Sequence, residues 1–470
     1  MDTPAIGGRY LTGNFAPIWT ESDAYWLPVT GELPKGLEGT LFRNGPNPQF
    51  WPTSPHHHWF GGDGMIHAFT IEKGRVRYRN RWVRTPKWQA ENAAGHPLFD
   101  PFGPPDPNVA NSDGCLDCVA NTNIIAHAGR LLALEEAHLP VELDRNSLAT
   151  LGFHDFGGAL KTPFTAHPKR DPRTGELLFF GYAAAGPFTS EIAFGTIDRQ
   201  GKLEQLEMFR APYSSMVHDF CVTERHLLFP ILPLVGSLER AQSGLPPFAW
   251  EPDRGAYVGV LRRGASAASL RWFRTESCYV FHVMNAWEDG SRVHADVMQY
   301  EQPAGFPWPD GRPTDRTKNA ARLCRWTFDL NAKTDAFRRE YLDDLRGEFP
   351  RVDDRRAGLA YRHGFYACST LAPEENPGLN MIADFDVSTG RRTVWVLPPG
   401  DVTSETVFVP RRPDAEEGDG YLLAVIWRSA ERRSDLVALD AGSVQDGPIA
   451  TVELSGRVPF GFHGNWVPSC

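Results

Sequence analysis

Four histidines in short apolar segments are the residues of this chain best suited to act together in chemistry. The segments read FTAHPK, MVHDFCV, VFHVMNA and FGFHGNW, and the histidines are His167, His218, His282 and His463. Their separations of 51, 64 and 181 residues correspond to about one, one and three repeats of about 60 residues. Because neutral imidazole is a common metal ligand, we predict that all four bind one metal ion. A lone histidine in such a segment is usually a hydrogen-bonded core residue, so the prediction depends on the regular recurrence.

The number of ligands favours iron over zinc at such a site. Four histidines would complete the tetrahedron of a zinc ion and leave no position for a reactant. Ferrous iron would keep two open positions, which suits the activation of dioxygen. The consecutive histidines at 56–58 form a less suitable group, because neighbouring residues of a strand point to opposite faces. We interpret them as part of a polar loop.

A metal-bound histidine commonly donates its second N–H group to a carboxylate, which fixes the tautomer and offsets the charge of the ion. Glutamates in otherwise apolar segments are the candidates for this role. Glu136, Glu348 and Glu405 all qualify, although from these properties alone each could equally be a surface or turn residue.

The elements that must position these residues are short strands. The chain has 44 glycines and 39 prolines, which separate brief β-branched and aromatic runs that alternate in period two. Hairpins are predicted at Lys73–Gly74 and Thr389–Gly390, where a glycine follows the first turn residue. Helical patterns are predicted only at Thr334–Arg346 and Val235–Ser243.

These patterns predict an all-β protein, a seven-bladed β-propeller with a few short helices and loops capping the metal-bearing face. The 470 residues would give about 67 residues to each blade, and a propeller directs one end of every innermost strand towards its axis. Because no Ser/Gly-rich or Pro-rich linker divides the sequence, we predict a single domain over residues 1–470, with residues 1–14 as a loosely ordered arm.

Composition limits the possible partners and the compartment. The formal net charge of −10 and the scattered basic residues argue against nucleic acid. The seven cysteines do not resemble a disulfide framework, and the single C-x-x-C pair, Cys115 and Cys118, is weak support for zinc. We find no signal peptide and no apolar run of 18 residues, so we expect a cytoplasmic protein. The 12% of aromatic residues could fill the spaces between blades or line an apolar tunnel.

Beyond these patterns, a series of ordered motifs resembles the carotenoid cleavage oxygenase family, which includes the lignostilbene dioxygenases. The resemblance runs from about Phe15 to the end of the sequence. The motifs are FRNGPNPQF (42–50), GGDGMIHAF (61–69), VANTN (119–123), TAHPKRDPRTGE (165–176), MVHDFCVTE (216–224), FHVMNAWEDG (281–290), EFPRVDDR (348–355), FVPRRPDAEEGDGYLL (408–423) and FHGNW (462–466).

The resemblance implies a seven-bladed propeller that holds Fe(2+) on its axis through the four histidines. It also implies that Glu136, Glu348 and Glu405 bond to three of those histidines and that His167 lacks such a partner. No added coenzyme is implied. A conjugated alkene would react with O2, and its C=C double bond would be cleaved to give two carbonyl products.

Within the family the chain most resembles the bacterial branch that cleaves stilbenes and phenylpropanoids, but two positions differ. Members of that branch carry a lysine and a tyrosine that bind the 4-hydroxyl group of the substrate, where this chain has Glu135 and, in an ungapped match, Phe102. This loss of polar partners favours a carotenoid or apocarotenoid over a 4-hydroxystilbene. Trp59 and Phe306 match pocket aromatics of the branch and could equally be packing residues.

Alternatives stay open at this point. The substrate could be a lignostilbene, another stilbenoid or a 4-propenyl or 4-vinyl phenol. The protein could instead be a redox-neutral isomerohydrolase or a propeller without catalysis. The apolar segment LLFPILPLVG (227–236) could make peripheral membrane contact, but a core strand followed by a loop is the interpretation that we favour. The sequence does not determine the oligomeric state.

Overall fold

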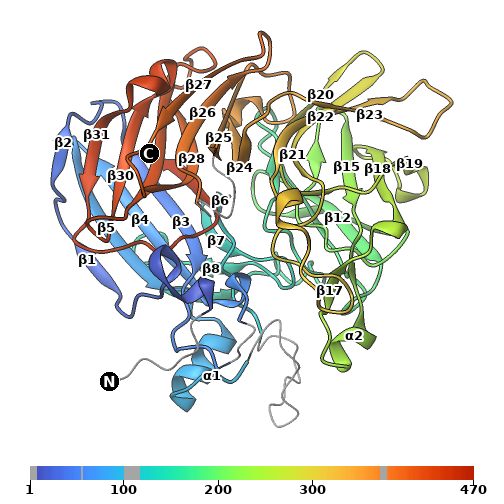
Figure 1. Cartoon of the computed structure of the whole chain (residues 1–470), viewed down its shortest axis with the longest axis horizontal. Coiled ribbons are helices and arrows are strands. Elements are labelled where there is room, and N and C mark those ends of the chain that lie inside the picture. The colour runs from blue at the N-terminus through green and yellow to red at the C-terminus, as the bar shows by residue number, and fades with distance from the viewer. Residues whose placement is uncertain (1–7, 54–56, 100–116, 371–377, 470) are drawn as a thin grey trace.

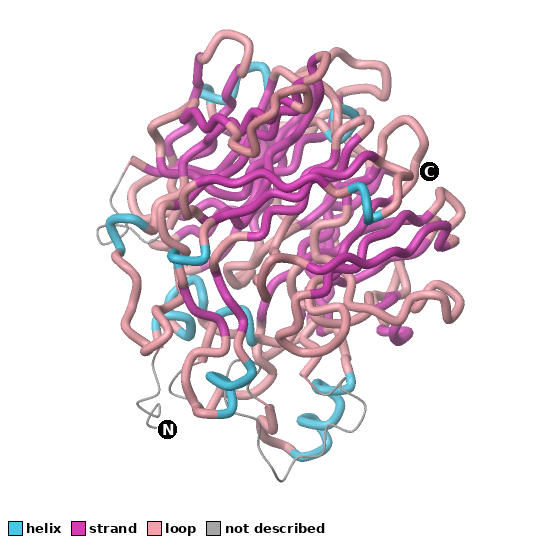
Figure 2. The backbone as a smooth tube through the Cα atoms, turned by 90° about the vertical axis from the view of Figure 1, so that its right-hand side faces the viewer, coloured by secondary structure: helices cyan, strands magenta, loops and turns pink. Residues whose placement is uncertain are grey.

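The computed structural model describes residues 8–53, 57–99, 117–370 and 378–469. Seven antiparallel sheets of four or five strands follow one another along the chain and form the blades of a propeller. The predicted fold class is therefore confirmed. Figure 2 shows that strands run through the centre of the body and that the helices are short and peripheral.

Blades 1 to 4 occupy the first part of the chain. Blade 1 contains β1 (Ser22–Ala24), β5 (Arg75–Trp82), β4 (Gly64–Glu72), β3 (Gly39–Pro46) and β32 (Gly464–Pro468). Blade 2 contains β6 (Asn123–His127), β7 (Arg130–Leu134), β8 (Val141–Leu143) and β9 (Thr150–Phe153). Blade 3 contains β10 (Lys169–Arg170), β11 (Leu177–Gly181), β12 (Glu191–Ile197) and β13 (Leu203–Arg210). Blade 4 contains β14 (Cys221–Val222), β15 (His226–Ile231), β18 (Ala256–Arg262) and β19 (Arg271–Thr275), with a separate pair, β16 (Leu234–Gly236) and β17 (Phe248–Trp250), between β15 and β18.

Blades 5 to 7 occupy the rest. Blade 5 contains β20 (Tyr279–Asp289), β21 (Arg292–Tyr300), β22 (Arg322–Asp329) and β23 (Arg338–Tyr341). Blade 6 contains β24 (Arg346–Val352), β25 (His363–Ser369), β26 (Met381–Asp386) and β27 (Arg391–Val396). Blade 7 contains β28 (Val402–Pro410), β29 (Gly420–Arg428), β30 (Arg433–Asp440), β31 (Pro448–Glu453) and β2 (Val29–Gly31).

Strands from the two ends of the sequence close the ring. Strand β32 pairs with β3, where Arg43 lies opposite Gly464, and β2 pairs with β31, where Val29 lies opposite Val452. In Figure 1 the red strands β30 and β31 accordingly lie beside the blue strands of blade 1. Two blades therefore combine residues that are more than 400 positions apart in the sequence.

The described residues form two α-helices, α1 (Pro86–Ala94) and α2 (Leu238–Gln242), which project from the same end of the molecule (Figure 1). Helix α1 begins after Thr85, whose hydroxyl accepts a hydrogen bond from the Trp88 amide. It is followed by Gly95, whose φ of 77° suits glycine. The pattern at 235–243 predicted a helix there, and α2 occupies its second half. The prediction missed α1.

The helix predicted at Thr334–Arg346 is wrong. The segment contains β23 (Arg338–Tyr341), which pairs with β22, and its last residue begins β24. Its charged and helix-forming residues lie on an exposed outer strand, where pairing with β22 overrides local propensity. The predicted hairpins are confirmed, since β4 and β5 meet at Lys73–Gly74 and β26 and β27 at Thr389–Gly390.

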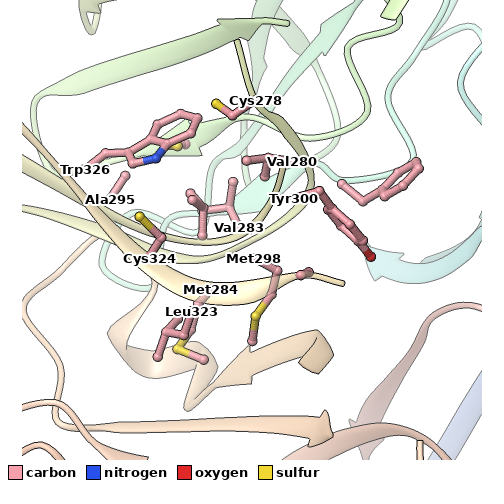
Figure 3. Packing of buried hydrophobic residues seen from close by; sticks show 14 of the residues in the cluster. Cys278, Val280, Val283, Met284, Ala295, Met298, Tyr300, Leu323, Cys324 and Trp326 are labelled. Carbon is pink, nitrogen blue, oxygen red and sulfur yellow. The ribbon is translucent and has the colours of Figure 1, made fainter. Parts of the chain in front are cut away.

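The core lies between neighbouring blades, where the alternating apolar residues of each strand face the next sheet. The largest cluster of buried residues involves blades 4, 5 and 6 and is shown in Figure 3. There Trp326 is fully buried opposite Ala295 of β21, and its indole N–H donates to Gln299 Oε1 at 2.9 Å. Residues 227–236 are all buried: β15 is the core strand that the favoured interpretation predicted, but β16 forms where it predicted a loop. Among the described residues, no helix is long and apolar enough to cross a membrane.

Candidate metal centre

The four predicted histidines occupy the same place in four blades, at or just before the first or the closing strand of the sheet. Two precede the short strands β10 and β14, one lies within β20, and one directly precedes β32. All are buried, and their ligand nitrogens lie within 4.8 Å of one another. The histidines are His167, His218, His282 and His463.

The inner nitrogens of these rings are arranged as ligands of a cation. His218 Nε2 lies 3.1 Å from His167 Nε2 and 3.2 Å from His282 Nε2. The inner Nε2 of His463 is buried and has no hydrogen-bond partner among the described residues. Nitrogens that present lone pairs to one another at such distances repel, unless a cation lies between them. The buried four-histidine group therefore suits a metal ion.

The outer nitrogens of three histidines meet glutamates, which leaves the inner nitrogens free to bind the ion. His463 Nδ1 lies 2.8 Å from Glu405 Oε1. His218 Nδ1 contacts Glu136 Oε1, and His282 Nδ1 contacts Glu348 Oε2. Among the described residues, no carboxylate forms such a pair with His167. The three carboxylates together offset the charge of a divalent ion.

Burial keeps two of the rings neutral, which a metal ligand requires. Burial and the neighbouring histidines lower the pKa of His167 far below its ordinary value. Burial likewise lowers the pKa of His463 to about 4, although Glu405 opposes this change. At neutral pH both rings can therefore bind a metal without first losing a proton.

A further layer holds the glutamates in place. The hydroxyl of Tyr182 donates to Glu136 at 3.0 Å, and that of Tyr300 donates to Glu348 at 2.7 Å. Glu405 instead accepts from the amide of Gly464 at 2.8 Å and lies 3.4 Å from Arg351 Nη1. Burial alone would raise the pKa of Glu405, but Arg351 and His463 outweigh it and lower this pKa to about 2.

Irregular strand pairing turns the key side chains of β20, β24 and β28 towards the axis. In each strand the register shifts at the functional residue: between Val280 and Val283 for His282, after Glu348, and between Thr403 and Thr406 for Glu405. A β-bulge inserts an extra residue and redirects the neighbouring side chain, which is why bulges are common beside active sites.

Asp219 joins three of the histidine-bearing segments and was missed in the sequence. Its carboxylate pairs with Lys169 at 2.7 Å, two residues after His167, and accepts from the amide of Val283 at 2.9 Å, one residue after His282. Because Asp219 itself follows His218, one buried carboxylate fixes the relative positions of three of the histidines. Its position next to a candidate ligand was the only signal in the sequence.

Several aromatic rings contact the histidines or one another. Phe281 and Phe349 lie with their ring centroids 5.3 Å from His218 and 5.4 Å from His282. Phe60 links Phe281, at 6.4 Å, to Phe306, at 6.0 Å. Trp59 contacts Phe462 at 4.2 Å, next to His463. The predicted pocket residues Trp59 and Phe306 thus both belong to a continuous aromatic wall that begins at the histidines.

The other two predicted pocket residues are placed differently. Glu135 is buried, and its Oε2 accepts from the amides of Val119 at 3.1 Å and Ala120 at 3.4 Å, while its Oε1 contacts His138. Its carboxylate is thus engaged by neighbouring protein groups. Phe102 lies outside the described residues.

Comparison with known proteins gives the class to which this fold and site belong. Residues 15–468 match the family model described as retinal pigment epithelial membrane protein. The chain is 40% identical to an isoeugenol monooxygenase of Pseudomonas nitroreducens, covering 97% of this chain and 98% of the relative. It is 37% identical to lignostilbene-alpha,beta-dioxygenase isozyme III of Sphingomonas paucimobilis, covering 97% and 96%. The crystal structure of a Pseudomonas brassicacearum lignostilbene dioxygenase superimposes with a TM-score of 0.94 at 35% identity and covers all of both chains.

The chain belongs to the carotenoid oxygenase family that this model defines. It is an oxygenase of the kind that cleaves carbon–carbon double bonds, as predicted. The resemblance stated from the motifs is confirmed over nearly the whole sequence.

Proposed function

We propose that this protein binds Fe2+ through its four histidines and uses O2 to cleave the C=C bond of an alkene conjugated to an aromatic ring, giving two carbonyl products. The observation that carries the proposal is the convergence of four inner imidazole nitrogens at one point beside a wall of aromatic rings.

The donor set supports iron. Four neutral imidazoles leave two coordination positions of a six-coordinate ion for reactants. The negative charge lies on the three glutamates, which bond to the histidines and not to the ion itself. When bound, ferrous iron would supply the activation of dioxygen. The conjugated alkene supplies the electrons, so no further reductant is required.

The residues of the chain have separate tasks in this reaction. The four histidines hold the ion, and the glutamates keep a proton on the outer nitrogen of three of them. The aromatic wall that includes Phe281, Phe306 and Phe349 provides apolar surface for a flat conjugated substrate and limits the access of water.

An arylalkene is the substrate class that we favour. The sequence argument for a carotenoid placed Glu135 at a position where the branch binds the 4-hydroxyl group of the substrate, yet its carboxylate already accepts two backbone amides and contacts His138. The names of the similar proteins, isoeugenol monooxygenase and lignostilbene dioxygenase, also support a phenylpropenoid or stilbenoid substrate.

The test is oxygen uptake by protein loaded anaerobically with Fe2+. The substrates are isoeugenol, a 4-hydroxystilbene and an apocarotenal, and mass spectrometry identifies the products. We expect one O2 consumed for each molecule of arylalkene cleaved, and labelling with 18O2 shows how many oxygen atoms enter the two carbonyls.

A matched pair of variants locates the reaction. His282→Ala should abolish oxygen uptake, whereas His294→Ala should retain it, because His294 stacks on Trp287 in the neighbouring strand and bonds to Thr327, outside the four-histidine group. Cleavage of the apocarotenal alone would refute the substrate class. Conversion without oxygen uptake would identify an isomerohydrolase, and inactivity on every alkene would refute the proposal.

A further inference from the structure

A second group of side chains of the types that bind metal ions lies beside the end of β7, outside the four-histidine group. It consists of Cys118, Glu135 and His138, whose ligand atoms lie within 4.8 Å of one another. Cys118 is fully buried, and Glu135 is 8% exposed. The cleavage reaction proposed above uses none of the three, and the inference below does not rest on it.

The His138 ring has a carboxylate at each of its nitrogens. Its Nδ1 contacts Glu135 Oε1, and its Nε2 lies 3.0 Å from Asp117 Oδ1. A metal-bound histidine typically presents one nitrogen to the ion and donates the N–H of the other to a carboxylate. The pairing of His463 with Glu405 follows this pattern at the four-histidine group, and Asp117 gives His138 the same arrangement.

The charges of the group call for a cation. Two carboxylates flank one imidazole, and the partly buried position of the group weakens screening by water. A cation held by Glu135 and His138 would offset these two negative charges.

We propose that Cys118 Sγ, a Glu135 oxygen and His138 Nδ1 bind a zinc ion, with a water molecule as the fourth ligand and Asp117 holding the outer N–H of His138. Sulfur, nitrogen and carboxylate oxygen are the ligands that zinc accepts together, whereas calcium and magnesium prefer oxygen alone. The ion would join residues 117–120 to the segment after β7 that carries Glu136. The amides of Val119 and Ala120 already donate to Glu135.

Cobalt provides a probe that separates the two sites. A thiolate bound to Co2+ produces a strong charge-transfer band in the near ultraviolet, and the four-histidine group contains no sulfur ligand. We expect metal-free protein to bind two equivalents of Co2+, with the thiolate band growing over only one of them. Zinc added in one equivalent should remove the band, and elemental analysis of the purified protein should find zinc in addition to the ion at the four histidines.

Two variants and a control assign the ligands. Cys118→Ser should lose the thiolate band and one equivalent of metal but retain the other equivalent. Cys324→Ser should retain both, because Cys324 is a buried cysteine of blade 5. His138→Gln keeps the thiol and should lower the affinity of the second site by roughly tenfold or more, which decides the matter if Cys118→Ser does not fold.

Three results would overturn this assignment. Binding of a single equivalent without a thiolate band would show that protonated His138 alone balances the two carboxylates. A band that survives in Cys118→Ser would place the thiolate elsewhere. An unchanged second affinity in His138→Gln would remove the histidine from the site.

Discussion

Replacing Glu405 by glutamine is expected to weaken metal binding and also to destabilise the metal-free protein. Glutamine keeps the size and one acceptor oxygen of Glu405 but removes its charge. The carboxylate accepts from His463 Nδ1 at 2.8 Å, and loss of such a partner lowers metal affinity by about 10- to 100-fold, or about 1.4 to 2.8 kcal/mol.

The loss of stability expected for Glu405→Gln comes from the loss of its interactions with two arginines. Glu405 lies 3.4 Å from Arg351 Nη1 and also stabilises the charge of Arg43, a buried guanidinium whose Nε has no hydrogen-bond partner among the described residues. Removal of one partner from a buried ion pair costs about 3 to 5 kcal/mol. Since Arg351 also donates to Gly464 O and Asn465 Oδ1, we expect the lower end, about 3 kcal/mol.

Glu348→Gln is the matched control for this prediction. Glu348 bonds to His282 in the same way, but it also accepts from the Tyr300 hydroxyl and the Phe349 amide. Its replacement should therefore weaken metal binding similarly and cost the metal-free protein only about 1 kcal/mol. Competition with a chelator measures the affinity, and urea unfolding of metal-free protein measures the stability. Equal stability losses in the two variants would refute the role assigned to the arginines.

Three further predictions concern pH, packing and metal removal. Burial and the charges of Arg43 and Arg457 lower the pKa of His67 from 6.5 to about 3. The unfolded state therefore binds more protons between these values, so stability is complete above pH 6.5 and falls by at most about 5 kcal/mol as the pH decreases to 3. The free energy of unfolding of His67→Gln, measured with urea, should lack this part of the pH dependence. If the free energies of the two proteins changed with pH in parallel, His67 would not be the cause. Trp326→Ala should cost about 3 to 5 kcal/mol, because it empties a fully buried site between blades, and an unchanged urea midpoint would exclude that packing role. Free metal at a hundred times its Kd should stabilise the protein by about 2.7 kcal/mol, whereas the unfolding temperature of His282→Ala should respond far less to added metal.

The sequence predicted the propeller and its four-histidine group because both depend on local patterns that recur. Each histidine lies in or just before an inner strand of a repeating unit, so their spacing indicated a common position in the blades. The role of Glu405 could be assigned only through the family resemblance, since its partner is 58 residues away and the bulge that turns it inward has no clear local pattern. The partners of Glu135, by contrast, are close in the sequence: His138 and the amides of residues 119 and 120. The direction in which the Glu135 side chain points nevertheless depends on how the chain folds there.

The seam of the ring gives the proposed metal a role beyond catalysis. His463 directly precedes β32, the strand that completes blade 1 by pairing with β3, whereas the other three histidines belong to blades 3, 4 and 5. A chain whose seam is open presents only three histidines, so the complete set of ligands exists only after closure. Part of the binding free energy of the ion therefore opposes the opening of the seam, and metal retention distinguishes closed rings from open ones.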